Sequence, residues 1–249
     1  APLLGSAILL FSSWQAEFLA PPIFAVIVFL WSLRLKESLP KIKRIPLNFI
    51  SIGKSIGSVL RNRTFLRYTG ITTLLFTALS SYVSSSEHII GGIYGKPSLF
   101  PWIFGSMGFF MALSTFINSY LATKYGARRT IKFLLIFYTL IAACLMLVLI
   151  SFGDPPSMLL FFISVTLMMA INLSIEPNSS ALALEPLGNV AGMASSIYGT
   201  IFFSVGAALG SIISNLMDSG VKPLVLSYFV IGICGLLLAY NERDHADDL

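Results

Sequence analysis

One stretch of the sequence brings hydroxyl groups, a carboxylate and an imidazole together at the end of a long apolar segment. It reads ALSSYVSSSEHIIGG and covers residues 78–92. Three of its serines follow the i, i+3 and i+4 spacing of one helix face: Ser81, Ser84 and Ser85. His88 continues that face, so the group could contact a polar substrate while Glu87 or His88 takes up a proton. The alternative is that Glu87 and His88 lie just outside the bilayer as solvated residues.

The chain carries little that supports covalent or metal chemistry. It contains two His and two Cys. The segment EHIIG, around His88, does not match the HExxH spacing of zinc proteases. Cys144 and Cys234 lie inside apolar runs without metal-ligand spacing. The sequence therefore predicts no catalytic residue, no metal, no cofactor and no enzymatic activity.

A second polar position lies late in the apolar segment 157–175. Asn172 stands there one helical turn after Met168. An amide at that depth is costly unless it meets a partner or water. Two interpretations stay open: Asn172 lines a substrate cavity together with Met168, or it forms a hydrogen bond to another helix.

The composition indicates that these residues are carried by membrane helices. The 249 residues are 56% hydrophobic and 11% charged, whereas soluble domains carry about 25% charge. Their apolar runs are continuous and of helical length, unlike the short alternating strands of a barrel, so we expect an all-α polytopic membrane protein. A short apolar stretch at 2–11 is followed by seven segments: 17–34, 66–86, 99–123, 131–152, 157–175, 189–214 and 223–240.

The Lys and Arg residues predict the orientation of these segments. If the segments alternate across the bilayer, fourteen of the sixteen cations lie on one side, and Lys96 and Lys222 lie on the other. The basic side is then cytoplasmic, which assigns loops 36–63 and 124–132 and the C-terminus to the cytoplasmic face of the inner (plasma) membrane. Gly126 supplies the freedom for a tight turn at 124–132. Membrane topology also explains the net charge of +5, so no nucleic-acid partner is expected.

The connections between the segments differ in length. Residues 36–63 contain NFISIGKSIGSVLRNR, whose helical apolar spacing predicts an amphipathic helix on the membrane surface. The two pairs Glu176-Pro177 and Glu185-Pro186 are expected to bracket a short polar cytoplasmic loop.

Four local patterns resemble motifs of one transporter family: APLLGS at 1–6, LRLKESLP at 33–40, NSYLATKYGARR at 118–129 and EPLGNVAGMASSIYG at 185–199. Together with the segment order, they make the chain resemble the major facilitator superfamily, in particular a drug:proton antiporter of the Bcr/CflA type. Pro2 and Gly5 match the end of the antiporter motif in that family's fifth helix. Other matches fall in the loop between its eighth and ninth helices: Asn118, Gly126, Arg128 and Arg129.

The resemblance implies how the chain is divided. Helices one to four and most of helix five would precede the sequence given, which is then expected to be a fragment. The expected parts are the end of the N-terminal bundle (1–35), a cytoplasmic linker (36–63), a six-helix C-terminal bundle built as a 3+3 inverted repeat (64–241) and a cytoplasmic tail (242–249). The resemblance also implies that the loop at 118–129 acts as a conformational switch, the alternative being a topology anchor only.

Two pairs of glycines have the GxxxG spacing that permits close helix approach in lipid. They are Gly188 with Gly192 and Gly206 with Gly210. We predict static helix packing at both pairs; the alternative is an interface that slides during transport.

The predicted function is transport, by resemblance. The whole protein would be a monomer in the lipid bilayer that exports small amphipathic drugs in exchange for protons by alternating access. The resemblance places the usual coupling acids in the preceding half of the protein, and Glu87 is the candidate within this chain. Two alternatives remain: an exporter of a metabolite such as a sugar or amino acid, and a half-bundle that does not transport.

Overall fold

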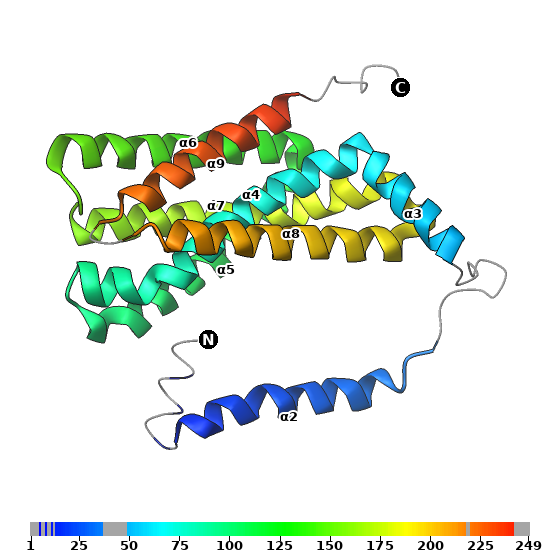
Figure 1. The fold of residues 1–249 in the computed structure, drawn as a ribbon, viewed down its shortest axis with the longest axis horizontal. Coiled ribbons are helices and arrows are strands. Elements are labelled where there is room, and N and C mark those ends of the chain that lie inside the picture. The colour runs from blue at the N-terminus through cyan, green and yellow to red at the C-terminus, as the bar shows by residue number, and fades with distance from the viewer. Residues whose placement is uncertain are drawn as a thin grey trace. The chain divides into compact units, whose positions relative to one another are not determined.

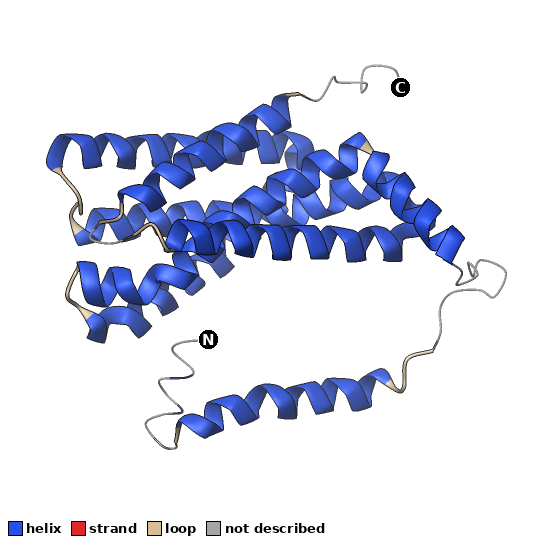
Figure 2. Ribbon diagram, in the orientation of Figure 1, coloured by secondary structure: helices blue, strands red, loops and turns tan. Residues whose placement is uncertain are grey.

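The computed structural model describes residues 13–36, 49–217 and 220–241, together with the single positions 5, 8 and 11 (Figure 1). The chain divides into two compact units, Ala1–Lys54 and Ser55–Leu249, and each is treated by itself. Within the described residues the regular structure is helical and no strand occurs (Figure 2). Pro2, at one of the motif positions, lies outside them.

The first unit contains one long helix, α2 (Trp14–Ser32). After Gln15 and Glu17 in its first turn, the helix is apolar around its circumference, which is the pattern of a helix surrounded by lipid or protein. At 19 residues it is long enough to cross a membrane. Pro21 and Pro22 lie inside α2 without ending it. Gly5 lies close to the Glu17 carboxylate of this helix.

The predicted linker helix is present as α3 (Phe49–Arg61). Val59 is fully buried, whereas Lys54 and Arg61 are exposed, so the helix has one apolar and one basic face. Asn62 then separates α3 from α4 and caps the second helix. Its Oδ1 accepts a hydrogen bond of 2.9 Å from the Phe65 backbone N–H.

Six long helices follow, and their bounds agree with the predicted apolar segments to within a few residues except at the end of α7. They are α4 (Arg63–Glu87), α5 (Phe100–Tyr125), α6 (Ala127–Phe152), α7 (Met158–Leu184), α8 (Ala191–Ser214) and α9 (Lys222–Tyr240). A π-helical turn, η2 (His88–Ile93), extends α4, and two short 3₁₀ segments, η3 (Pro97–Leu99) and η4 (Glu185–Val190), precede α5 and α8.

The helix contacts repeat in two matched sets. α4 packs on α8 as α7 packs on α5, and α4 packs on α9 as α7 packs on α6. The α4–α7 contact and the α6–α9 contact each stay the same when the first three helices are exchanged with the last three. Exchanging α4–α6 with α7–α9 therefore preserves the main helix contacts, as expected for a 3+3 inverted repeat.

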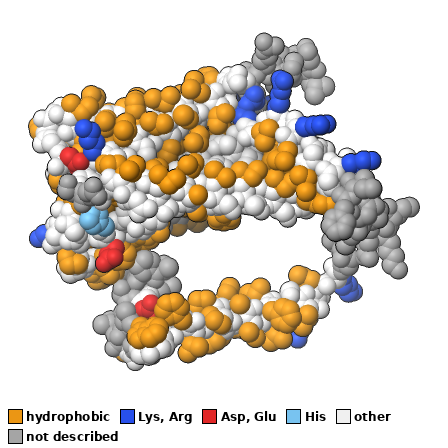
Figure 3. All heavy atoms as spheres, in the orientation of Figure 1, with side chains coloured by type: hydrophobic (Ala, Val, Ile, Leu, Met, Phe, Trp, Pro, Cys, Tyr) orange, Lys and Arg blue, Asp and Glu red, His pale blue; other side chains and the backbone are white. Residues whose placement is uncertain are grey.

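Apolar side chains cover much of the outside of this bundle (Figure 3), and others form its buried core. Tyr68 and Tyr138 are buried in the core, while Phe116 and Phe152 on the outer surface are 75% and 85% exposed. Among the described residues, five helical stretches are long and apolar enough to cross a membrane: Trp14–Ser32, Pro97–Tyr125, Ala127–Phe152, Met158–Ser214 and Lys222–Tyr240. α4 is not among them, because its many Ser and Thr residues lower its hydropathy.

Most described cations of the bundle gather at one end, which we call the basic end. α4 and α6 begin there and α5 finishes there (Figures 1 and 3). Lys96 and Lys222 lie at the opposite end, where α5 and α9 begin. The predicted tight turn is confirmed, since Gly126 alone separates α5 from α6 and has φ +81°. That φ is strained for residues with a Cβ.

A carboxylate fixes the loops at the opposite end. The two Asp154 oxygens accept hydrogen bonds of 2.8 Å and 3.0 Å from the backbone N–H groups of Val221 and Lys222, at the start of α9. The Tyr94 hydroxyl donates to the Pro156 carbonyl at 3.0 Å. These bonds tie the α6–α7 loop to the ends of two other helices.

Candidate functional site

A small cavity opens between α4, α5, α7 and α8. Its volume is about 50 Å³, which is enough for one or two water molecules. Three lining residues come from α4, one from α5, three from α7 and one from α8: Thr72, Phe76, Leu79, Met111, Asn172, Leu173, Glu176 and Phe202. We call this cavity the Glu176 notch.

Glu176 is the charged residue among those that line the notch. It is half-buried and lies eight residues before α7 ends at Leu184, so it is roughly 12 Å inside the basic end of the helix. The predicted loop between Glu176 and Glu185 is therefore wrong. Pro177 lies inside α7 without ending it, and membrane helices tolerate proline where neighbouring groups satisfy the freed carbonyl.

Two buried hydrogen bonds connect the helices around this carboxylate. The Tyr198 hydroxyl of α8 donates to Thr72 Oγ1 of α4 at 2.9 Å, and Tyr198 also interacts electrostatically with Glu176. The Asn172 amide of α7 donates to the Leu75 carbonyl of α4 at 2.6 Å. Three helices thus surround one carboxylate with hydroxyl and amide groups.

Aromatic rings form another wall of the notch. The Phe76 and Phe202 rings meet edge to face with centroids 5.3 Å apart, and Phe203 lies 5.0 Å from Phe76 in the same way. Phe76 and Phe202 are partly exposed. The lining of the notch is therefore mostly apolar, with a few polar groups from α4 and α7.

The residues of the predicted polar face of α4 are not all buried or all exposed in the structure. Ser81 and Ser85 are buried, and Ser85 Oγ donates to the Ser81 carbonyl. Ser84, Glu87 and His88 are exposed instead. Neighbouring residues lie about 100° apart around a helix, so Ser84 points away from the packed side that holds Ser85.

Asn172 and Met168, predicted together, have different surroundings. Asn172 both lines the notch and forms an interhelical hydrogen bond, so the structure combines the two interpretations left open by the sequence. Met168 is fully buried in the core and is not among the residues that line the notch.

Asn118 does not lie in the turn that its motif suggested. It is buried in α5, where its Oδ1 accepts a hydrogen bond of 2.7 Å from the Asn178 amide of α7. One turn away, Ser174 Oγ lies 3.2 Å from Ser114 Oγ, and Ser114 Oγ donates to the Ala170 carbonyl at 2.9 Å. Polar side-chain contacts therefore join α5 to α7 at the residues where the turn was expected to begin.

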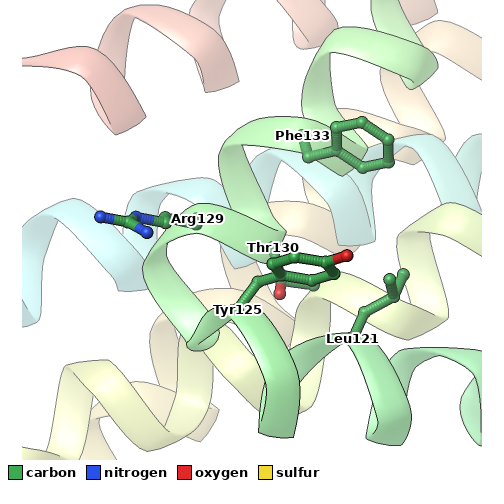
Figure 4. Close-up of a pocket in the computed structure, with 5 residues that line it drawn as sticks. All are labelled: Leu121, Tyr125, Arg129, Thr130 and Phe133. Carbon is green, nitrogen blue, oxygen red and sulfur yellow. The ribbon is translucent and has the colours of Figure 1, made fainter.

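The turn itself lies beside an apolar hollow at the basic end. A cavity of about 360 Å³ is lined by Leu121, Tyr125, Arg129, Thr130 and Phe133 (Figure 4). Arg129 is exposed and Arg128 is half-buried.

The two glycine pairs have different environments. A Cβ on Gly206 would lie 3.1 Å from the Thr73 carbonyl oxygen, and one on Gly210 would lie 2.8 Å from the Ser81 nitrogen. The predicted close packing is therefore confirmed for this pair, which places α8 against α4. It is wrong for Gly188 and Gly192, where an added Cβ would have no neighbour within 4 Å, because Gly188 belongs to η4 rather than to α8.

An exposed apolar exterior, repeated helix packing and internal polar groups define a multi-pass helical membrane protein. Comparison with protein families identifies it more closely, because the Major Facilitator Superfamily model matches residues 1–211. The chain belongs to this superfamily, whose members are transporters rather than enzymes.

Two curated relatives are similar over nearly the whole chain. An uncharacterized MFS-type transporter, YdgK, of Bacillus subtilis is 30% identical over 251 residues, covering 97% of this chain and 60% of that protein. A bicyclomycin resistance protein homolog of Haemophilus influenzae is 29% identical over 248 residues, covering 96% and 60%. The chain thus spans about 60% of the length of each relative.

Proposed function

We propose that the whole protein exports small amphipathic drugs in exchange for protons by alternating access. The observation that carries this proposal is the position of Glu176 in the notch between four helices. Holding a charge at the centre of a membrane helix costs about 2.5–3.5 kcal/mol on insertion scales, and such residues usually mark ion or substrate pathways. Glu176 lies beside hydroxyl and amide groups that suit this purpose.

Glu176 is the proton-exchanging group in this proposal. The notch has room for one or two water molecules, through which a proton can reach the carboxylate. Protonation removes the negative charge from the region between α7 and α8, and so changes how the helices around the notch interact. Glu87, the candidate from the sequence, is exposed at the end of α4 and serves as the rival in the experiments below.

The substrate is drug-like in this proposal for two reasons. One relative carries the name of a bicyclomycin resistance protein homolog, and the notch has an aromatic rim formed by Phe76 and Phe202. Ser84 of α4 and His88 at the start of η2 are both exposed, and they are the further substrate contacts that we propose. Ser81, Ser85 and Met168 are buried inside the bundle and are not substrate contacts in this proposal. A metabolite exporter would share the fold and differ in what these residues contact.

The orientation is part of the proposal. The basic end faces the cytoplasm of the inner membrane, because Lys and Arg concentrate on the cytoplasmic side of membrane proteins. The linker, the Gly126 turn and the C-terminus then share that side, residues 1–35 belong to the N-terminal bundle, and the complete protein acts as a monomer.

Drug accumulation in cells tests the proposal. Cells that lack their own drug pumps and express the full-length protein should accumulate less of a fluorescent amphipathic drug than control cells. A protonophore should abolish that difference. Glu176→Gln should abolish it too, whereas Glu185→Gln, which removes an exposed carboxylate in η4, should not. A difference that persists with the protonophore contradicts proton coupling.

A further inference from the structure

The four cations around the Gly126 turn do not share one environment. Lys124 Nζ lies 5.2 Å from the centroid of the Tyr125 ring, and Lys132 Nζ lies 5.3 Å from that of Tyr240. Arg128 also interacts with a neighbour. Cation–π contacts of this kind stabilise the positive charge of each ammonium group.

Arg129 differs from the other three. Within the part of the chain that the structure describes, its guanidinium makes no hydrogen bond, ion pair or ring contact. It is exposed, and it lines the cavity of about 360 Å³ between the end of α5 and the start of α6. An unpaired guanidinium, with five donors in a planar fork, is well suited to bind a phosphate group.

The remaining walls of this cavity are suited to hydrocarbon. Leu121 is partly buried, and Tyr125 and Phe133 are about half exposed. Figure 4 shows the Arg129 side chain pointing away from those of Leu121 and Phe133. Thr130 is already satisfied, since its hydroxyl donates to the Gly126 carbonyl at 2.9 Å. A ligand that fills the site therefore needs an anionic head and a separate apolar tail.

The position of the cavity identifies the source of such a ligand. It lies at one end of two membrane-spanning helices, α5 and α6, and half-exposed aromatic side chains border it. Lipid surrounds the outside of a membrane helix bundle, and basic hollows between helix ends can hold lipid head groups. The volume lies within the range of about 300–1,000 Å³ found for ligand pockets.

We propose that this cavity binds an anionic phospholipid, with its phosphate at Arg129 and one acyl chain along Leu121, Tyr125 and Phe133. The bound lipid contacts both the last turn of α5 and the first turn of α6, on either side of the Gly126 turn. The site is independent of drug export, so it stands whether or not Glu176 exchanges protons.

Native mass spectrometry of the full-length protein tests the site. Protein purified in mild detergent is supplied with phosphatidylglycerol or phosphatidylcholine that carry the same acyl chains. Wild-type protein should retain one phosphatidylglycerol in preference to phosphatidylcholine. Arg129→Gln should lower the phosphatidylglycerol-bound fraction about fivefold, as expected from the loss of one cation near an anionic head group.

Two further variants separate this site from general surface charge. Arg63→Gln removes an exposed cation at the first residue of α4, also at the basic end, and should leave retention unchanged. Leu121→Trp fills the cavity without altering charge and should also lower retention. Equal retention of both lipids by the wild type, or equal losses in Arg63→Gln and Arg129→Gln, would overturn the proposal. Full retention in Leu121→Trp would do the same.

Discussion

The contact between α8 and α4 at Gly210 allows a quantitative prediction. A Cβ at this position would lie 2.8 Å from the Ser81 backbone nitrogen and 2.7 Å from the Ser80 Cβ. Carbon atoms in good contact are about 3.5–4.0 Å apart. The Gly210→Ala methyl group therefore requires α4 and α8 to separate by roughly 0.7 Å, because backbone atoms on both sides prevent a local adjustment.

Gly199→Ala supplies a matched control in the same helix. Gly199 lies in the interior of α8, and a Cβ there has no neighbour within 4 Å. This control should be neutral or stabilising by up to about 1 kcal/mol, because alanine favours a helix over glycine. Gly210→Ala should destabilise the bundle by about 1–3 kcal/mol, as overpacked substitutions do.

The free energy of unfolding of the full-length protein, measured in detergent micelles with increasing denaturant, compares the two variants. Gly210→Ala should be the less stable variant by at least about 1 kcal/mol. Equal stability of the two variants would refute the close approach of α8 to α4. A Gly199→Ala protein less stable than Gly210→Ala would refute it as well.

Three other substitutions have expected outcomes. Asn178→Ala leaves the buried Asn118 carbonyl without its donor and should cost about 1–3 kcal/mol of unfolding free energy; replacing both residues with leucine should restore part of it. Asp154→Ala removes the acceptor of two N–H groups at the start of α9 and should cost about 0.5–2 kcal/mol, with faster amide exchange confined to that helix start. Gly126→Ala places a Cβ at φ +81° in open space, so backbone strain alone should cost about 1–3 kcal/mol in denaturant titrations. Stability unchanged from wild type in any of the three would show that the group in question is not needed for packing.

The sequence predicted most of the fold because apolar length and cation placement are strong signals. Segments without charge had to span the membrane, and the chain had to turn at Gly126, where cations lie on both sides. The exception was Glu176-Pro177, where two residues typical of loops lie inside α7. Local propensity failed there because helices packed around α7 supply contacts that a loop would lack. The spacing of Asn172 and Glu176 at i and i+4 was the available signal that these two residues share one helix face.

The site was harder to predict because its residues come from different helices. Tyr198 and Thr72 are 126 positions apart, and nothing in either local sequence indicates their hydrogen bond. The same is true of Asn118 and Asn178, which are 60 positions apart. The serines of α4 shared a helical spacing, but the spacing alone could not show which part of the face packs against other helices.

Proton movement coupled to drug movement is the decisive test of whether Glu176 exchanges protons during export. The full-length protein is reconstituted into liposomes that enclose a pH-sensitive dye, and a drug gradient is imposed across the membrane. We expect drug flux through wild-type protein to drive protons in the opposite direction. Glu176→Gln should abolish this proton movement, and Glu87→Gln should retain it. Drug flux without proton movement in the wild type would contradict proton exchange, and unchanged proton movement in Glu176→Gln would contradict the role of Glu176.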